Sequence, residues 1–441
     1  MHEELGAEAE ELFKALDTEP LTSIRLNPLK PAEVFEGEAV GWSPCGRYLG
    51  SRPQFTLDPL LHGGAYYVQE ASSQFVGHLL RGLDLEGRRV LDMCAAPGGK
   101  STIYSTLVGR SGLVVANDIS RNRALALADN VQRWGVGNVV VTCNQPSHIG
   151  EFEHWFDVVA VDAPCSGEGM FRKMDEARTE WSPSSPEVCA ERQREILTQA
   201  WRALRPGGTL LYSTCTFNSL EDEGVVKWLM EEYGDELVAA DRVELEDDWG
   251  VVRSDIGVFQ CFHFYPHKAQ GEGFFAAIAC KADGPNRRTN VKPRRKLFQM
   301  LAKADEAEVA RWVDNPQNVA FRLVGEMIYG YDKSVVDDVV ALSEALSVVY
   351  SGVCFGQIFK RKLKPEHPLA LYVGFNNDVV PSVEVDLDTA LDFLRRQDVA
   401  AGEFEEGINR VVYRGVAIGF VKRIGGRCNN MYPKDLRILK L

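Results

Sequence analysis

The sequence lacks several patterns that would place it in common functional classes. Its 10 cysteines include no C-x-x-C pair, which disfavours a zinc site. No run approaches the roughly 20 apolar residues of a membrane-spanning helix. The glycine spacings G-x-G-x-x-G and G-x-x-x-x-G-K are both absent, so a dinucleotide site is disfavoured and a P-loop is excluded. Residues 1–16 predict an acidic amphipathic helix and not a signal peptide, so we expect a cytoplasmic, monomeric chain with reduced thiols that binds no metal and no membrane.

Positive charge is also scarce. The formal net charge is −14, which taken alone argues against a nucleic-acid partner, because phosphate contacts need Lys and Arg. Two stretches depart from this balance: residues 287–296 hold six basic residues and no acid, and residues 410–441 hold eight basic residues against Asp435 alone. Both could contact a nucleic-acid backbone. The alternative is a solvated linker and a solvated face.

Short apolar runs bounded by turn residues recur through the middle of the chain, and helical patterns separate them. The five runs are 88–94, 112–118, 138–143, 156–162 and 208–215. This alternation predicts β-α-β units and a doubly wound, Rossmann-like parallel sheet of the α/β class. Two later runs, 258–264 and 273–280, are joined by a segment too short for a parallel crossover, so they predict an antiparallel edge hairpin.

These patterns divide the chain into four predicted parts. Residues 1–85 form an N-terminal α+β lobe, in which 66–80 looks helical, and residues 86–284 form the sheet domain. Residues 285–350 are a basic linker and an α-rich connecting domain, and residues 351–441 are a small, mostly β module. Its strand candidates are 356–363, 370–375, 408–414 and 416–423.

The stretch VLDMCAAPGGKS (90–101) lies at the first strand-to-helix junction, which in a doubly wound sheet is a binding crevice. Glycines there let the backbone approach a ligand closely. Asp118 lies at the tip of the second strand, where an acid can bind both ribose hydroxyls. A glycine loop and this acid, without a pyrophosphate motif, fit S-adenosylmethionine. The alternative is a pair of packing glycines and a surface Asp.

Two cysteines follow the fourth and fifth strands, in DAPC and STC. Because these strands are usually neighbours, we expect Cys165 and Cys215 in one cleft beside the cofactor loop. A thiolate that adds to carbon 6 of a pyrimidine makes carbon 5 nucleophilic, and Asp162 could hydrogen-bond the cytosine ring. Lys100 and Arg172 are candidates for lowering a thiol pKa. These arguments leave open which cysteine attacks.

In four segments the chain resembles the RNA cytosine-5 methyltransferases of the NOL/NOP2/Sun family. They are DMCAAPGGKS, ANDIS, VDAPCSGEGMFRK and YSTCTFNSLEDE. The segments IRLNPLK and YYVQEASSQ are similar to the family's N-terminal motifs, and residues 351–371 and 417–437 are similar to the C-terminal PUA-like module of its bacterial RsmF (YebU) branch, which acts on 16S ribosomal RNA.

The resemblance implies that Cys215 is the nucleophile and that Cys165 assists product release. With Asp162 and Lys100, singled out above by their chemistry, they make up the predicted catalytic set. Cofactor residues carried over from the family are Cys94, Ala95, Ala96, Pro97, Gly98, Gly99, Lys100, Asp118 and Asp162. The family's Asp after the third strand is missing, so Asn144 or Gln145 must replace it. DNA cytosine-5 methyltransferases attack with the P-C cysteine, which keeps the reverse assignment possible.

The implied function is cytosine-5 methylation of 16S ribosomal RNA, on naked RNA or on the small ribosomal subunit. The same chemistry on tRNA is the nearest alternative. A noncatalytic RNA-binding assembly factor is the other, although it would not need the two cysteines, Asp162 and the glycine loop together.

Overall fold

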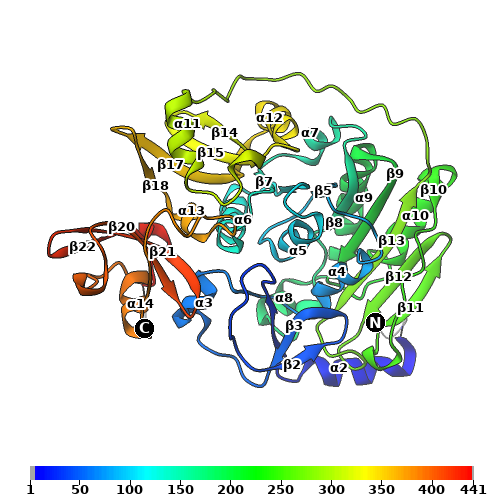
Figure 1. Cartoon of the computed structure of the whole chain (residues 1–441). Coiled ribbons are helices and arrows are strands. Elements are labelled where there is room, and N and C mark those ends of the chain that lie inside the picture. Colours follow the sequence, from blue (N-terminus) through cyan, green and yellow to red (C-terminus); the bar gives the residue numbers. More distant parts are fainter. Residues whose placement is uncertain (1–4, 440–441) are drawn as a thin grey trace.

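The computed structural model describes residues 5–439 of the 441-residue chain. The predicted N-terminal helix lies in part outside these residues, and its described part is a 3-10 turn, η1 (Gly6–Glu8), followed by α2 (Ala9–Leu16). Across residues 5–439 the strands form four sheets (Figure 1). No helix in this range combines the length and the apolar character that crossing a membrane requires.

The N-terminal lobe is a small antiparallel sheet with short helices. Its strand order is β2-β3-β1-β4. The strands are β1 (Thr22–Leu26), β2 (Glu38–Val40), β3 (Ser43–Leu49) and β4 (Tyr66–Val68), and the helices are α3 (Pro59–His62) and α4 (Phe75–Leu79). The prediction of a helix from residue 66 is wrong at its start, because Tyr66, Tyr67 and Val68 pair with β1. Strand pairing overrides the local pattern there.

The central sheet has ten strands among the described residues, in the order β11-β12-β13-β9-β8-β5-β6-β7-β16, with β10 beside β13. Its parallel part consists of β5 (Arg89–Asp92), β6 (Leu113–Asn117), β7 (Val139–Thr142), β8 (Phe156–Asp162) and β9 (Leu204–Thr214). The antiparallel strands are β10 (Leu237–Val238), β11 (Val252–Ile256), β12 (Phe259–Phe264), β13 (Phe274–Lys281) and β16 (Val348–Ser351). The predicted doubly wound sheet and its edge hairpin, β12–β13, are confirmed.

Helices cover both faces of this sheet (Figure 1). On one face lie α7 (Pro146–Gly150), α9 (Ser185–Ala203), α10 (Glu223–Tyr233) and α12 (Val336–Ala345). On the other lie α4, α5 (Gly99–Val108) and α6 (Arg121–Trp134). The short α8 (Asp175–Glu180) precedes α9. With two covered faces, β6 and β7 are buried at every residue, as their Val-rich sequences predict.

Two further four-stranded sheets follow within the described chain. One contains β14 (Val319–Val324), β15 (Met327–Asp332), β17 (Val353–Phe359) and β18 (Lys362–Pro365), with α11 (Lys303–Ala310) and α13 (His367–Leu371). The other contains β19 (Ser382–Glu384), β20 (Gly407–Tyr413), β21 (Val416–Ile424) and β22 (Arg427–Asn430), with α14 (Leu387–Leu394). The strand predicted at 370–375 is wrong, because α13 and a turn occupy it. The four domain boundaries stay a prediction.

The N-terminal lobe and the last sheet share one hydrophobic core. Ile24, Leu60 and Tyr66 belong to the same buried cluster as Phe393 and Ile418. Helix α3 of the lobe packs against α14 and β21. The first and last parts of the fold therefore stabilise each other directly.

We expect Phe393→Ala to destabilise the chain by about 3–5 kcal/mol, because it opens a cavity in this shared core. The side chain is 0% exposed and packs on Tyr432 at 5.4 Å between ring centroids. Urea unfolding measures the change. Phe359→Ala is the matched control, since that ring is 65% exposed; equal losses in both variants would contradict the role of the shared core.

Candidate active site

Two cysteine side chains meet where β8 and β9 end. The parallel register pairs Asp162 with Ser213, so Cys165 and Cys215 follow at adjacent strand tips. Their Sγ atoms are 3.2 Å apart, and the backbone N–H of Cys215 donates to Sγ of Cys165 at 3.3 Å. The hydrogen bond to Cys215, burial and the charge of Cys215 raise the pKa of Cys165 well above its ordinary value. Cys165 therefore keeps its proton in the resting protein.

Asp162 forms a polar centre beside the thiols. One carboxylate oxygen accepts a hydrogen bond from Ser213 Oγ at 2.8 Å, and the other lies 2.7 Å from Lys100 Nζ. Burial alone would lower the pKa of Lys100, but the charge and hydrogen bond of Asp162 raise it overall, with smaller contributions from Asp92 and Cys215. Lys100 thus stays cationic next to Cys215, and such a charge favours a thiolate.

The thiols open into a cavity of about 840 Å³ that also reaches the glycine loop and the tip of β6. Asp118 lines it, is 3% exposed, and binds the N–H of Ser120 at 2.8 Å and Arg123 at 3.2 Å. Six predicted site residues line the cavity, namely Cys94, Ala96, Asp118, Asp162, Cys165 and Cys215. Ala95, Pro97, Gly98, Gly99 and Lys100 do not line it, although Lys100 forms an ion pair with the lining residue Asp162.

The glycine loop needs its glycines for close packing. Gly98 has φ 110°, and a Cβ at this position would lie 2.8 Å from Cδ1 of Leu127. Any other residue would strain the backbone and press on α6. Helix α5 starts at the next residue, so its free N–H groups begin at the loop. The loop can therefore hold a polar ligand group near the backbone.

The N-terminal lobe supports this loop from behind, a role that the sequence alone does not reveal. Arg25 donates to the Gly99 carbonyl at 3.1 Å and to Thr102 Oγ1 at 2.5 Å, and it stacks on Trp134 at 4.4 Å. The Tyr67 hydroxyl donates to the Pro97 carbonyl at 3.1 Å. Burial lowers the pKa of Arg25 to about 10. Arg25 lies in IRLNPLK and Tyr67 in YYVQEASSQ, the two N-terminal motifs.

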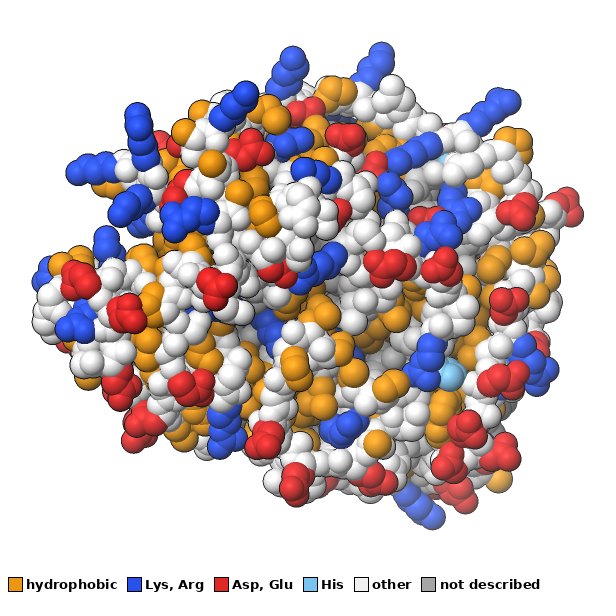
Figure 2. Space-filling view, in the orientation of Figure 1, with side chains coloured by type: hydrophobic (Ala, Val, Ile, Leu, Met, Phe, Trp, Pro, Cys, Tyr) orange, Lys and Arg blue, Asp and Glu red, His pale blue; other side chains and the backbone are white. Residues whose placement is uncertain are grey.

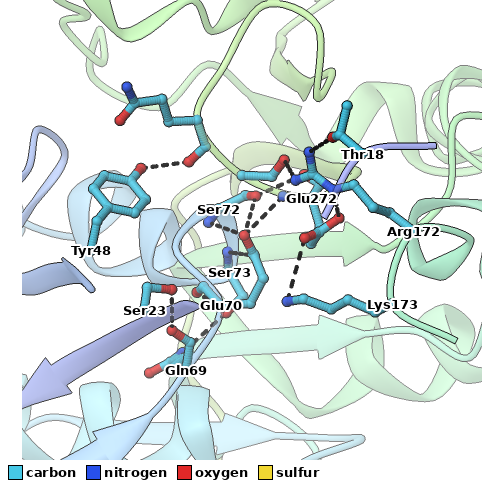
Figure 3. Close-up of polar contacts among 12 residues, drawn as sticks. Thr18, Ser23, Tyr48, Gln69, Glu70, Ser72, Ser73, Arg172, Lys173 and Glu272 are labelled. Atoms are coloured by element: carbon cyan, nitrogen blue, oxygen red, sulfur yellow. Dashed lines mark hydrogen bonds and ion pairs between the residues drawn. The ribbon is translucent and has the colours of Figure 1, made fainter. Parts of the chain in front are cut away.

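Arg172 does not reach the thiols and instead joins a buried network between three segments (Figure 3). Its guanidinium binds Glu272 at 2.8 Å and donates to the Gly271 carbonyl at 2.8 Å. Glu70 accepts hydrogen bonds from the backbone N–H groups of Ser72, Ser73 and Glu272, each at 2.9 Å (Figure 3). The network attaches the loop after Cys165 to the N-terminal lobe. Of the two cations predicted to tune a thiol, only Lys100 is in place.

Glu221, another residue that sequence reasoning did not single out, connects the two cysteine loops. Its Oε2 accepts from the N–H of Ser166 and from Gln193 Nε2, both at 2.9 Å, and its backbone carbonyl accepts from the Tyr212 hydroxyl at 2.6 Å. Burial raises the pKa of Glu221. Glu221 belongs to the segment after Cys215 that resembles the family, and this is the sequence feature that could have identified it.

Of the two residues expected to replace the missing third-strand Asp, only Gln145 lines the cavity. The Asn144 side chain is buried and exchanges two hydrogen bonds with the backbone of Ser347, at 3.0 and 3.2 Å. Gln145 is exposed and lines the cavity.

The polar groups of the cavity suit an organic cofactor better than a metal ion. Residues 5–439 contain no group of three or more His, Cys, Asp or Glu side chains that could hold a metal ion. The polar groups present are instead an acid at the tip of β6, a glycine loop and paired thiols. This set and the sheet order define an S-adenosylmethionine-dependent methyltransferase.

Comparison with known proteins identifies the family. A family model described as 16S rRNA methyltransferase RsmB/F matches residues 83–279. Models of the N-terminal domain of 16S rRNA methyltransferase RsmF and of the methyltransferase RsmF PUA domain match residues 1–71 and 380–438. The chain belongs to this RsmF-type family, and the resemblance inferred from its motifs is confirmed.

Individual relatives agree with the family models. "Ribosomal RNA small subunit methyltransferase F" of Klebsiella pneumoniae is 32% identical over 85% of this chain and 78% of its own length. The protein of that name from Shewanella amazonensis is 30% identical over 96% and 90%. A methyltransferase homolog protein from Pyrococcus horikoshii is 29% identical, with TM-score 0.51 over 63% of this chain and 91% of its own. NSun6 from the same organism, solved with SFG, shares the fold at 22% identity, with TM-score 0.52 over 63% of this chain and 95% of its own.

We expect Gln145→Ala to weaken S-adenosylmethionine binding about 5-fold, by loss of one hydrogen bond of ~1 kcal/mol to the adenine. Asn144→Ala should instead lower the free energy of unfolding, because it frees the Ser347 backbone next to β16. Calorimetric titration and urea unfolding separate the two effects. Equal cofactor affinity of wild type and Gln145→Ala would contradict the assignment.

Proposed function

We propose that this protein methylates carbon 5 of a cytosine in 16S ribosomal RNA through a covalent bond between Cys215 and carbon 6 of the base. The observation that carries the proposal is the 3.2 Å approach of two thiols inside the cavity that holds the cofactor acid Asp118. The relatives are named as small-subunit ribosomal RNA methyltransferases, which supports a ribosomal substrate. These relatives align with most of this chain, which supports the same substrate for this protein.

The residues around the cavity fit S-adenosylmethionine. Asp118 would hold the ribose hydroxyls, Cys94 and Ala96 of the glycine loop would contact the cofactor, and Gln145 would accept from the adenine amino group. When bound, the cofactor supplies an electrophilic methyl group. Ile119 and Pro146 also line the cavity and offer apolar contact to a purine ring.

Cys215 begins the reaction on the base. Its thiolate adds to carbon 6, and the electron pair of the carbon 5–carbon 6 double bond moves into the ring, which makes carbon 5 nucleophilic. Asp162, held by Ser213 and Lys100, would hydrogen-bond the ring nitrogen and the amino group and so favour protonation of the ring as sulfur adds. A target base must leave its stack to reach this depth.

Cys165 then assists release. The hydrogen bond and the charge of Cys215, which both raise the pKa of Cys165, disappear once Cys215 is bonded to the ring, whereas burial still raises it and the backbone N–H of Cys215 still lowers it. Cys165 can then lose its proton to water and accept the carbon 5 proton. The electron pair of that C–H bond restores the ring double bond and expels Cys215 as a thiolate.

Loss of one 5-methylcytosine in 16S ribosomal RNA is the expected phenotype of cells without the gene. Bisulfite sequencing of ribosomal and transfer RNA tests it. Expression of wild type should restore the signal, and Cys215→Ala should fail to restore it. Cys280→Ala, whose thiol is outside the cavity, is the control and should restore it. Restoration by Cys215→Ala would overturn its role as nucleophile, and a signal lost only from tRNA would replace the substrate.

Cys165→Ala should trap the protein on RNA, because the carbon 5 proton is no longer removed. We expect a slow, protease-sensitive band on a denaturing gel when the variant is incubated with unmethylated 16S transcript and S-adenosylmethionine. The double variant Cys165→Ala/Cys215→Ala is the control and should give no such band. Absence of the band from the single variant would assign release to another group.

A further inference from the structure

The hairpin β17–β18 has a conformation that its sequence does not favour. The register pairs Phe359 with Lys362, so the loop consists of two residues, Lys360 and Arg361. Both have positive φ, 49° and 62°. A turn of this kind strongly prefers Asn-Gly or Asp-Gly, because most side chains are strained there. Strained backbone of this kind concentrates at functional sites.

The hairpin also presents an aromatic ring among cations. Phe359 lies directly opposite Lys362, and Lys364 lies opposite Gln357 on the same face. The other face carries Ile358 and Leu363, which pack into the core of this sheet. Phe359 is 65% exposed, and Lys360 lies over its ring at 5.4 Å. The exposed face thus combines a flat apolar ring with positive charge.

In the part of the chain that the structure describes, no acid neutralises the cations of the hairpin. All four, Lys360, Arg361, Lys362 and Lys364, are exposed, and none forms an ion pair within residues 5–439. Two acids contact the hairpin, and both accept hydrogen bonds from uncharged groups: Glu326 from the Gln357 amide at 3.4 Å and Glu308 from the backbone N–H of Leu363 at 3.3 Å. Lys and Arg side chains gather at the upper left of Figure 2, where Figure 1 places the outer ends of β17 and β18.

Much of the charge in the two predicted basic stretches is used internally. Arg288 binds Asp338, and Arg294 binds Glu151. In the tail, Arg410 donates to the Ala370 carbonyl and stacks on Phe375, and Arg423 donates to the Phe404 carbonyl. These arginines hold the fold together and leave less charge for RNA than the sequence suggests.

We propose that the β17–β18 hairpin binds a single-stranded segment of the RNA substrate, with one base stacked on Phe359 and phosphates on Lys360, Arg361, Lys362 and Lys364. Stacking on an aromatic ring inside a cationic surface is the general means of holding unpaired nucleotides. The hairpin precedes residues 380–438, which match the PUA domain, so it is a separate contact. The proposal rests on RNA being the substrate.

The turn allows a variant that separates binding from folding. Lys360→Asn/Arg361→Gly removes two cations and installs the preferred turn sequence, so its thermal stability should equal or exceed that of wild type. Its affinity for a labelled single-stranded RNA oligonucleotide should fall. The slope of log K against log salt should shrink by about 1.4, for two lost phosphate contacts.

Phe359→Ala should weaken binding about 5- to 100-fold, and Phe359→Tyr should retain it, because only stacking is removed. A matched control, Lys14→Ala/Lys333→Ala, removes two exposed lysines elsewhere and should keep the wild-type slope. Point substitutions are needed, because deleting residues 351–441 would expose the core shared with the N-terminal lobe.

An unchanged affinity and salt slope in both hairpin variants would overturn the proposal. Binding of wild type but not of the variants to anionic lipid vesicles, with RNA affinity intact, would replace it by a membrane contact. If wild type methylates 16S transcript, unchanged RNA binding by the variants speaks against the hairpin alone. Failure of the proposed function would instead appear as no methyl transfer by wild type or by any variant.

Discussion

The parallel pairing of β8 with β9 is the constraint on which the rest of the site depends. Because Asp162 lies beside Ser213 in the register, the chain after each strand delivers one thiol to the same point. The Ser213–Asp162 hydrogen bond and the ion pair of Asp162 with Lys100 depend on the same register. A shift by one residue would turn every side chain of a strand to the opposite face. The deep burial of both strands between helical layers fixes the register, so the hydrophobic core sets the sulfur-to-sulfur distance.

Buried ion pairs and hydrogen bonds connect the site to the N-terminal lobe. Arg25 connects the N-terminal lobe to the glycine loop, and Arg172 with Glu272 and Glu70 connects it to the loop after Cys165. Removing one partner of such a group leaves an unpaired buried charge, which is strongly destabilising. The lobe is therefore part of the scaffold of the candidate site, and damage to it would reach the glycine loop and the thiols together.

Much of the fold follows from local sequence. The strand–helix alternation predicts the sheet, and the short connection predicts the hairpin β12–β13. The position of Cys165 and Cys215 at strand ends predicts their proximity. Features set by distant partners could not be predicted: β4 forms because β1 is available to it, and Arg410 and Arg423 are captured by backbone carbonyls. Asn144 shows the same limit, since its two hydrogen bonds go to the backbone of Ser347, a residue 203 positions away in the sequence.

The core shared by residues 24–66 and 385–438 has a consequence for how the chain is made. Translation produces the N-terminal lobe first, but the apolar surface that completes it emerges some 320 residues later, when α14 and β21 leave the exit tunnel. At roughly 5–20 residues per second, this leaves the lobe unfinished for tens of seconds. Such an interval would expose nascent chains to chaperones and proteases, and would delay an active enzyme until translation is almost over.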